Sequence, residues 1–331
     1  MLRFVIEECR NDTIFPTQAK YFFEPLKTLI VIVGPTAVGK TDLSIQVAEY
    51  FKSEILSADS RQFYRETEIG TAKPTAEELA RVPHHFVNSR SIFEPYDVGT
   101  YEQEALIKLE LLFDQFPTAV MVGGSGLFVD AVCKGLDDLP KGTEELRADL
   151  RALFDDRGLV ALQEEVQRVD PVYFDQVDRQ NPQRLMRALE VYRVSGRPYS
   201  SFRTGKKAQR PFNCLKIGLT MDREKLYSRI DQRMDLMIEA GLFNEAESLF
   251  PHRALNALQT VGYKEIFGYL NGEYDKEEAI RLLKRNSRRY AKRQLTWFRR
   301  DPETHWFEAG QPNEVLSYLD KEIALKRSET K

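Results

Sequence analysis

The stretch "KTLIVIVGPTAVGKT", residues 27–41, decides the fold. Its first half is an unbroken apolar run, which is typical of a strand buried on both faces of a parallel sheet. Its second half, residues 34–41, matches the pattern G-x-x-x-x-G-K-[ST] in full, and the helix-like segment "KTDLSIQVAEYFK" follows. A strand, a glycine-containing loop and a helix in this order predict a phosphate-binding loop.

The predicted loop suits a diphosphate or a nucleotide because its backbone N–H groups and the helix N-terminus both favour anions. Lys40 is expected to bridge phosphates, and the Thr41 hydroxyl is expected to hold Mg²⁺, the predicted cofactor. A chance match is the alternative, and the flanking strand and helix disfavour it. The motif leaves the reaction open, because kinases and other diphosphate-binding proteins share it. The predicted diphosphate-binding residues are Gly34, Pro35, Thr36, Ala37, Val38, Gly39, Lys40 and Thr41.

Three more strand-like runs follow the first one. They are "SEILSADS" at 53–60, "FPTAVMVGG" at 116–124 and "PFNCLKIGLT" at 211–220. Alternation with helical segments predicts an α/β fold with a parallel sheet. A charged, helical region from about 143 to 195 interrupts the pattern. We therefore expect an N-terminal extension (1–26), a core made of 27–136 and 209–312, a helical insertion domain (137–208) and a C-terminal tail (313–331).

Composition narrows the class of protein. The 331 residues carry a formal net charge of -3, so the chain is not a nucleic-acid binder by bulk charge. No apolar run approaches the roughly 18 residues of a membrane span, and the N-terminus does not read as a secretory signal. The cysteines Cys9, Cys133 and Cys214 fit neither a disulfide framework nor a zinc site, which favours the cytoplasm. We assign His84 and His85 structural roles and expect a monomer, since no coiled-coil pattern is evident.

The segment "SADSRQFY", residues 57–64, places Asp59 at the end of the second predicted strand. Ligands of open parallel sheets bind at the carboxyl ends of the strands. The phosphate loop, Asp59 and the turn that contains Ser125 should therefore face one crevice. A helix cap, a water-mediated Mg²⁺ contact and a general base are all open roles for this carboxylate.

Residues 281–300 contain nine Lys or Arg and no acid, all on one side of a predicted helix. Leu283, Tyr290, Trp297 and Phe298 lie on the other side. This pattern favours a polyanion partner over a merely solvated helix, which usually mixes both signs. The segment "QRLMRALEVYRVSGR", 183–197, has a similar basic bias. Two such helices beside a crevice predict a folded RNA as the partner.

Taken together, eight segments resemble the tRNA dimethylallyltransferase (tRNA isopentenyltransferase) family, in family order from residue 29 to about 300. They are "GPTAVGKT", "SADSRQFY", "IGTAKPT", "VGGSGLF", "GLDDLP", "NPQRLMRALEV", "TVGYKEI" and "AKRQLTWFR". The resemblance implies a P-loop NTPase-like core with a helical insertion. It also implies transfer of a dimethylallyl group from dimethylallyl diphosphate to N6 of the adenosine at tRNA position 37, 3′ of the anticodon, with release of pyrophosphate.

The resemblance also implies residue roles. Asp59 would be the general base, Arg233 would stabilise the departing pyrophosphate, and Ser125 would lie at the catalytic centre. Arg184 and Arg187 fit surface charges as well, and Trp297 fits a core position. The residues implied to contact the tRNA anticodon stem-loop are Asp59, Ser60, Arg61, Gln62, Ser125, Arg147, Gln183, Arg184, Leu185, Met186, Arg187, Gln259, Thr260, Val261, Gly262, Tyr263, Lys264, Lys292, Arg293, Gln294, Leu295, Thr296, Trp297, Phe298 and Arg299.

The chain departs from the family pattern at three positions. Ser125 stands for the usual Thr and keeps the hydroxyl, whereas Phe128 stands for the usual Tyr and loses a hydrogen bond. Glu66, in "RETEIG", stands in a loop that is usually of a Gly-Met-Asp type, which leaves access of the substrate open.

Three rival functions remain at this point. A nucleotide or small-molecule kinase would explain the phosphate loop but not the basic helix. An adenylate isopentenyltransferase would be expected to lack the long C-terminal RNA-binding portion. A non-catalytic RNA-binding protein would not be expected to keep the loop and Asp59 intact.

Overall fold

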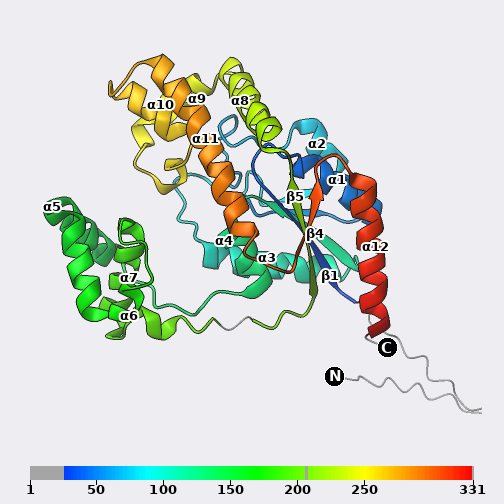
Figure 1. Ribbon diagram of the computed structural model, residues 1–331, viewed down its shortest axis with the longest axis horizontal. Coiled ribbons are helices and arrows are strands. Elements are labelled where there is room, and N and C mark those ends of the chain that lie inside the picture. The colour runs from blue at the N-terminus through cyan, green and yellow to red at the C-terminus, as the bar shows by residue number, and fades with distance from the viewer. Residues whose placement is uncertain (1–25, 206–207, 330–331) are drawn as a thin grey trace, which may run out of the picture.

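A parallel β-sheet forms the centre of the molecule in the computed structural model, which describes residues 26–205 and 208–329 (Figure 1). The strand order is β3-β2-β4-β1-β5-β6. The strands are β1 (Thr28–Val33), β2 (Ile55–Ser57), β3 (His84–His85), β4 (Thr118–Gly123), β5 (Asn213–Thr220) and β6 (Thr304–Glu308). The predicted α/β fold is confirmed, and the predicted extension lies, apart from residue 26, outside the described residues.

The first strand occupies a central place that explains its unbroken apolar sequence. All six residues of β1 are buried, between β4 on one side and β5 on the other. Val33 pairs with Gly123 and with Gly218, so the carboxyl ends of these strands lie at one edge of the sheet. The loops that follow β1, β2 and β4 therefore lie together at this edge.

The sequence missed two short edge strands. The first, β3, has only two residues, of which His85 Nε2 lies 2.6 Å from Glu54 Oε2 and His84 Nδ1 lies 2.8 Å from the Val82 carbonyl. The second, β6, reads "THWFE" and is buried mainly at Thr304. Neither carries the apolar run that marks an internal strand.

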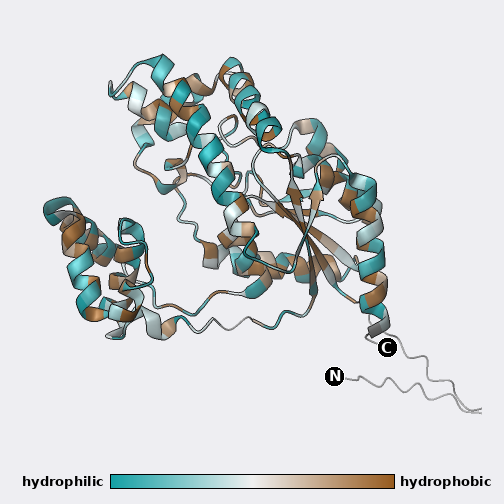
Figure 2. Ribbon diagram, viewed as in Figure 1, coloured by the Kyte–Doolittle hydropathy of each residue, from teal (hydrophilic) through white to brown (hydrophobic). Residues whose placement is uncertain are grey.

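Helices cover both faces of the sheet. The helices α1 (Lys40–Phe51) and α12 (Pro312–Glu329) pack on the face of Ile30 and Ile32. The helices α3 (Val98–Phe113) and α4 (Gly126–Lys134) pack on the face of Leu29 and Val31. Figure 2 shows the apolar strands enclosed between these layers.

The predicted C-terminal tail is wrong. Val315, Leu319 and Ile323 of α12 are at most 4% exposed and belong to the core on one face of the sheet. Their spacing of four residues puts them on one face of a helix. Because that stripe lies in an otherwise polar segment, the sequence pattern does not mark it as part of the core.

The region between α4 and β5 folds as a helical lobe with its own apolar cluster, on the left of Figure 1. It contains α5 (Glu144–Val169), α6 (Pro171–Phe174), α7 (Pro182–Ser195) and the 3₁₀ helix η1 (Tyr199–Phe202). Leu150, Leu162 and Leu189 pack against one another in this cluster, apart from the sheet.

The C-terminal helices lie beside the carboxyl edge of the sheet. They are α8 (Arg223–Glu239), α9 (Leu242–Leu249), α10 (Tyr263–Leu270) and α11 (Lys276–Phe298), with the 3₁₀ helices η2 (Phe250–His252) and η3 (Asn256–Leu258). A short helix, α2 (Ala76–Arg81), follows β2. Across 26–205 and 208–329, no helix combines the length and apolarity needed to cross a bilayer.

Candidate active site

The phosphate loop lies between β1 and α1, as the motif predicts. Ala37 (φ 64°) and Gly39 (φ 104°) take the left-handed backbone conformation, which glycine adopts at little cost. Gly39 is the N-cap of α1, and no side chain caps this helix. Lys40 folds back so that its Nζ donates to the Pro35 carbonyl at 2.8 Å. The N-terminal amides of α1 are thus available to an anion.

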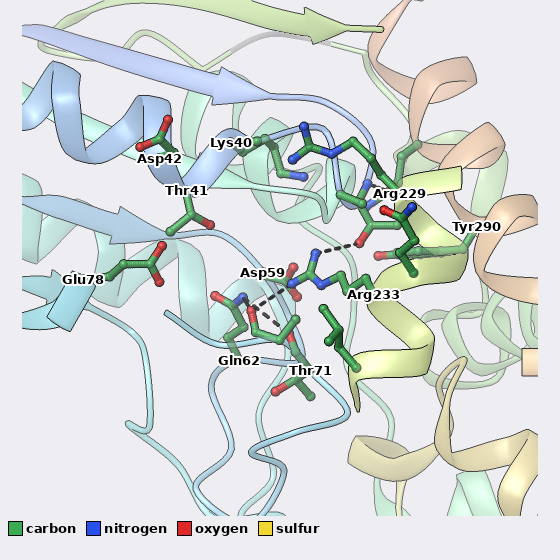
Figure 3. A pocket seen from close by; sticks show the side chains of 17 residues that line it. Lys40, Thr41, Asp42, Asp59, Gln62, Thr71, Glu78, Arg229, Arg233 and Tyr290 are labelled. Carbon is green, nitrogen blue, oxygen red and sulfur yellow. Dashed lines mark hydrogen bonds between the residues drawn. The ribbon is translucent and has the colours of Figure 1, made fainter. Parts of the chain in front are cut away.

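A cavity of about 650 Å³ opens over this loop (Figure 3). Asp59 lies within it, with Lys40 and Arg233 approaching from two sides. Its lining combines the loop with α8 and α11. The polar and charged residues that line it are Thr36, Lys40, Thr41, Asp42, Asp59, Gln62, Thr71, Glu78, Arg229, Gln232, Arg233, Tyr290 and Gln294.

The pKa values of two cationic side chains in this cavity are lowered by their surroundings. Burial lowers the pKa of the Lys40 ammonium to about 8; the Asp59 carboxylate opposes this shift, and the Arg233 charge adds to it. Burial also lowers the pKa of Arg233, again opposed by Asp59. An anion placed between them would relieve their mutual repulsion, as in sites for phosphates.

Asp59 follows β2 and faces the turn after β4. Its Oδ1 accepts a hydrogen bond from the Arg61 amide at 3.1 Å. Next to it, Ser125 Oγ accepts from the Ser60 amide and donates to Ser60 Oγ, both at 3.0 Å. A Cβ at Gly123 would lie 2.4 Å from the Ala58 carbonyl, so the two strand ends approach too closely for a side chain there.

Arg61 and Gln62 make contacts within the protein. Arg61 Nη1 donates to the carbonyls of Asn256 and Ala257 at 2.8 and 3.1 Å. Gln62 Nε2 donates to the Ala72 carbonyl at 3.1 Å, while Gln62 also lines the cavity. These side chains fix the loops around Asp59, and their predicted contact with RNA stays a prediction.

The inner face of α11 closes the site. Gln294 Oε1 accepts a hydrogen bond from the Thr36 amide at 2.8 Å, and its Nε2 donates to the Gly124 carbonyl at 3.0 Å. Tyr290, one turn earlier, lines the cavity, and burial followed by the Asp59 charge raises its pKa to about 12. The sequence pattern puts Tyr290 on the apolar face of the helix and does not predict its place in the site. Its i, i+4 spacing from Gln294 is the available signal.

Several predicted RNA contacts have buried side chains, and their contact with RNA stays a prediction. Leu185 is fully buried in the helical lobe, Tyr263 is fully buried against α9, and Phe298 is 5% exposed in the core. Gln294 is also 5% exposed. In each case the side chain serves packing or an internal hydrogen bond.

Other predicted RNA contacts are partly engaged. Trp297 is half-buried and donates from Nε1 to Asp130 Oδ2 at 2.8 Å, which fits its alternative role in the core. Arg147 and Arg187 both pair with the buried Glu190, at 3.1 and 2.8 Å. The predicted contacts that are exposed are Gln183, Arg184, Gln259, Lys264, Lys292, Arg293, Thr296 and Arg299.

The basic face of α11 is divided along its length. In its first half, Arg281 pairs with Glu278, Lys284 with Asp235 of α8, and Arg288 with Asp231 of α8, each at 2.6 Å. Arg285, also in this half, is without an ion pair to another described residue. In the second half, the exposed Arg289, Lys292 and Arg293 make no ion pair with another described residue, nor do Arg299 and Arg300 directly after the helix. Uncompensated positive charge is therefore concentrated beyond Arg288, a division that the sequence count of nine cations did not show.

The residues around Thr41 fit a bound Mg²⁺. Protein sites for this ion supply few ligands and leave the rest to substrate phosphates and water. Thr41 lines the cavity beside the phosphate loop, and the carboxylates of Asp42, Asp59 and Glu78 line the same space. Among the described residues, no cluster of three or more His, Cys, Asp or Glu side chains forms a closed metal site. This set suits an ion that is shared with a diphosphate.

Comparison with known proteins identifies the family. The model of the family described as IPP transferase matches residues 62–301. A tRNA dimethylallyltransferase 1 of Bacteroides fragilis is 51% identical over 297 residues, which cover 90% of this chain and 99% of the relative. The chain belongs to the IPP transferase family. The family match begins after Asp59, so the phosphate loop and this carboxylate are independent arguments for it.

Solved structures of IPP transferases share the fold. The tRNA isopentenylpyrophosphate transferase of Bacillus halodurans has a TM-score of 0.69 and 37% identity, covering 92% of this chain and 99% of that one. A eukaryotic dimethylallyltransferase, described as acting on tRNA, has a TM-score of 0.72 and 27% identity, covering 86% and 74%. As a member of this family the protein is a prenyltransferase enzyme.

The departures from the family pattern have structural counterparts. Glu66 accepts from Ser91 Oγ at 2.5 Å and from the Ile92 amide at 3.0 Å, so it joins its loop to the segment before α3. Phe128 packs in a tilted arrangement against Phe63 and Tyr101, which is a purely apolar use of the ring. Neither residue lines the cavity.

Proposed function

We propose that the protein transfers a dimethylallyl group from dimethylallyl diphosphate to N6 of the adenosine at tRNA position 37, with release of pyrophosphate. The acceptor is an anticodon stem-loop. The names of the relatives support tRNA as the class of substrate. The observation that carries the proposal is that Asp59 shares one cavity with the phosphate loop, Lys40 and Arg233.

The cationic groups act on the leaving group. The loop amides and Lys40 hold the diphosphate, and Arg233 faces it from α8. As the bond between the allylic carbon and oxygen breaks, charge accumulates on the pyrophosphate oxygens, and these preplaced donors stabilise it. When bound at Thr41, Mg²⁺ supplies further positive charge for the same oxygens.

Asp59 acts on the nucleophile. The lone pair of an exocyclic adenine amine is delocalised into the ring, so attack on the allylic carbon produces a cationic nitrogen. Asp59 accepts the proton that this nitrogen must lose, as general base. The hydrogen bond from the Arg61 amide to Oδ1 fixes the carboxylate. Tyr290 and Ser125 lie beside it, and at the raised pKa of about 12 the Tyr290 hydroxyl remains protonated.

The adenosine must leave its stack to reach Asp59, which costs a few kcal/mol and least in a loop. While the adenosine is out of its stack, the exposed cations in the second half of α11 and on α7 bind the RNA backbone. We further propose a monomer that works in the cytoplasm, where the free thiols of Cys133 and Cys214 would persist.

The test is a mass measurement. The protein is incubated with Mg²⁺, dimethylallyl diphosphate and an anticodon stem-loop RNA that carries adenosine 3′ of the anticodon. We expect a gain of one dimethylallyl group, and none with guanosine at that position. Prenylation of free AMP, or consumption of ATP with the RNA unchanged, would contradict the proposal.

A further inference from the structure

Glu245, on α9, makes an unusual set of contacts outside the cavity. Its Oε2 accepts from the amides of Glu68 and Ile69 at 2.9 and 2.8 Å. Its Oε1 accepts from the Gly70 amide at 2.9 Å and from the Tyr263 hydroxyl at 2.6 Å. Three consecutive backbone N–H groups that converge on one anion form a nest. Here the anion is a side chain of the protein itself.

The segment held in this way has no regular secondary structure of its own. Residues 69–72 form a turn that follows a bend at Glu68, and Ala72 takes a left-handed backbone with φ 49°. A Cβ at Gly70 would lie 2.6 Å from the Tyr263 ring, so this ring packs directly on the segment. Burial, followed by the charge of Glu245, raises the pKa of Tyr263, so its hydroxyl stays a donor. Glu245 and Tyr263 together hold one side of this segment.

The other side of the same segment contacts the catalytic cavity. The Ala72 carbonyl accepts from Gln62 Nε2 at 3.1 Å and from Arg233 Nη2 at 3.3 Å. Arg233 Nη1 lies 3.5 Å from Thr36 Oγ1 in the phosphate loop. Arg233 is therefore held between the Ala72 carbonyl and the phosphate loop, and a shift of this carbonyl would change the direction in which Arg233 points.

We infer that Glu245 is a positioning residue for pyrophosphate binding: by anchoring 68–70 it fixes the Ala72 carbonyl that aims Arg233 into the cavity. Glu245 does not line the cavity itself, so it acts only through the segment and Arg233. The inference rests on the proposed function, in which Arg233 faces the diphosphate. It adds a residue of α9, a helix outside the phosphate-loop motif, to the functional residues.

Glu245→Gln is the decisive variant. The amide keeps the shape of the side chain. In either orientation, however, its NH₂ group faces two of the groups that donate hydrogen bonds to the carboxylate, and it cannot accept them. We expect the Kd for inorganic pyrophosphate and the KM for dimethylallyl diphosphate to rise about tenfold, because small displacements of positioning groups cost up to about 10²-fold. RNA affinity should stay within about twofold of the native protein. Glu247→Gln, on the exposed side of α9, removes the same charge and should change neither constant.

A double variant tests the route. If Glu245 acts through Arg233, Glu245→Gln should add nothing to the loss of pyrophosphate affinity in Arg233→Ala, whereas independent effects would multiply. Multiplied effects, or native pyrophosphate affinity in Glu245→Gln, would overturn the inference. If Glu245→Gln does not fold, Tyr263→Phe is the second variant, because it removes only the hydrogen bond from the Tyr263 hydroxyl to Glu245. It should raise the Kd for pyrophosphate about threefold, and it should have no further effect in Arg233→Ala.

The two proposals fail separately. If the native protein does not prenylate the RNA, the proposed function is wrong, while pyrophosphate titration still reports on Glu245. If the native protein prenylates the RNA and Glu245→Gln binds pyrophosphate normally, only the inference about Glu245 is wrong.

Discussion

Gln294 of α11 accepts a hydrogen bond from the amide of Thr36 in the phosphate loop, 2.8 Å away and 258 positions apart in the chain. The same side chain donates to the Gly124 carbonyl, after β4. The helix whose outer face carries the free cations thus also fixes the loop that is proposed to bind the diphosphate. The proposed RNA contact and the proposed binding of the diphosphate would thus depend on one helix.

Gln294→Met tests this connection. Methionine keeps the length of the side chain but leaves the half-buried Thr36 amide and the buried Gly124 carbonyl without their partner, which should lower the free energy of unfolding by about 1–3 kcal/mol. The freed loop should also bind pyrophosphate more weakly. Urea unfolding and pyrophosphate titration measure the two effects. Thr296→Ala, an exposed position on the same helix, is the control, and unchanged pyrophosphate affinity in Gln294→Met would refute the connection.

Asp59→Asn should separate catalysis from binding. Without a base for the proton on N6, single-turnover prenylation should slow by about 10²–10⁴-fold. Pyrophosphate and RNA should bind about as tightly as to the native protein. Glu247→Gln removes an exposed carboxylate that does not line the cavity, and it controls for the change in net charge. An equal loss of rate in both variants would assign Asp59 an electrostatic role in place of proton transfer.

Lys40 should give pyrophosphate binding a pH dependence. Its pKa of about 8 in the free protein means that the ammonium loses its proton above that pH, and the bound anion favours the protonated form. Affinity for pyrophosphate should therefore be full below pH 8 and fall above it. Titration from pH 6.5 to 9.5 measures this, and Lys40→Met should bind weakly without the step near pH 8. A native profile that is flat across this range would contradict the prediction.

The same residue should affect stability with the opposite sign. The pKa of Lys40 in the folded protein lies below the ordinary lysine value of 10.5, so the unfolded chain binds more protons between about pH 8 and 10.5. The penalty of the buried charge is present below pH 8 and disappears as the pH rises through that window. The stability difference between the native protein and Lys40→Met should shift in favour of the native protein across it. Urea unfolding of both proteins at pH 7 and 10 provides the measurement.

How far the sequence predicts this molecule depends on the range of the interactions. The runs that became β1, β4 and β5 are apolar over most of their length, because strands inside a parallel sheet are buried on both faces. Asp59 and the phosphate loop were predictable because the carboxyl ends of such strands meet at one edge.

Contacts between distant segments were not predictable in the same way. Glu245 looks like any exposed helix acid, and only the folded chain brings it to the amides of 68–70. The family resemblance implies an RNA contact for Gln294, whereas its i, i+4 spacing from Tyr290 puts it on the inner face of α11. The acids of α8 that neutralise the first half of α11 lie about 50 residues earlier, so a local charge count could not include them.

That division of the basic face leads to a prediction about salt. Lys292 and Arg289 are exposed and make no ion pair with another described residue, so each is free to displace counterions from an RNA phosphate. Changing either to Gln should weaken binding of the anticodon stem-loop and lower the slope of log Kd against log salt by about 1.

Lys284 is the matched control, since it carries the same charge on the same helix but pairs with Asp235 at 2.6 Å. Lys284→Gln should leave the salt slope unchanged, because its charge is already compensated. Fluorescence anisotropy of a labelled stem-loop over a range of KCl concentrations measures all three variants. If Lys284→Gln lowered the slope as much as Lys292→Gln, the RNA would follow the whole helix, and the acids of α8 would have to release their partners on binding.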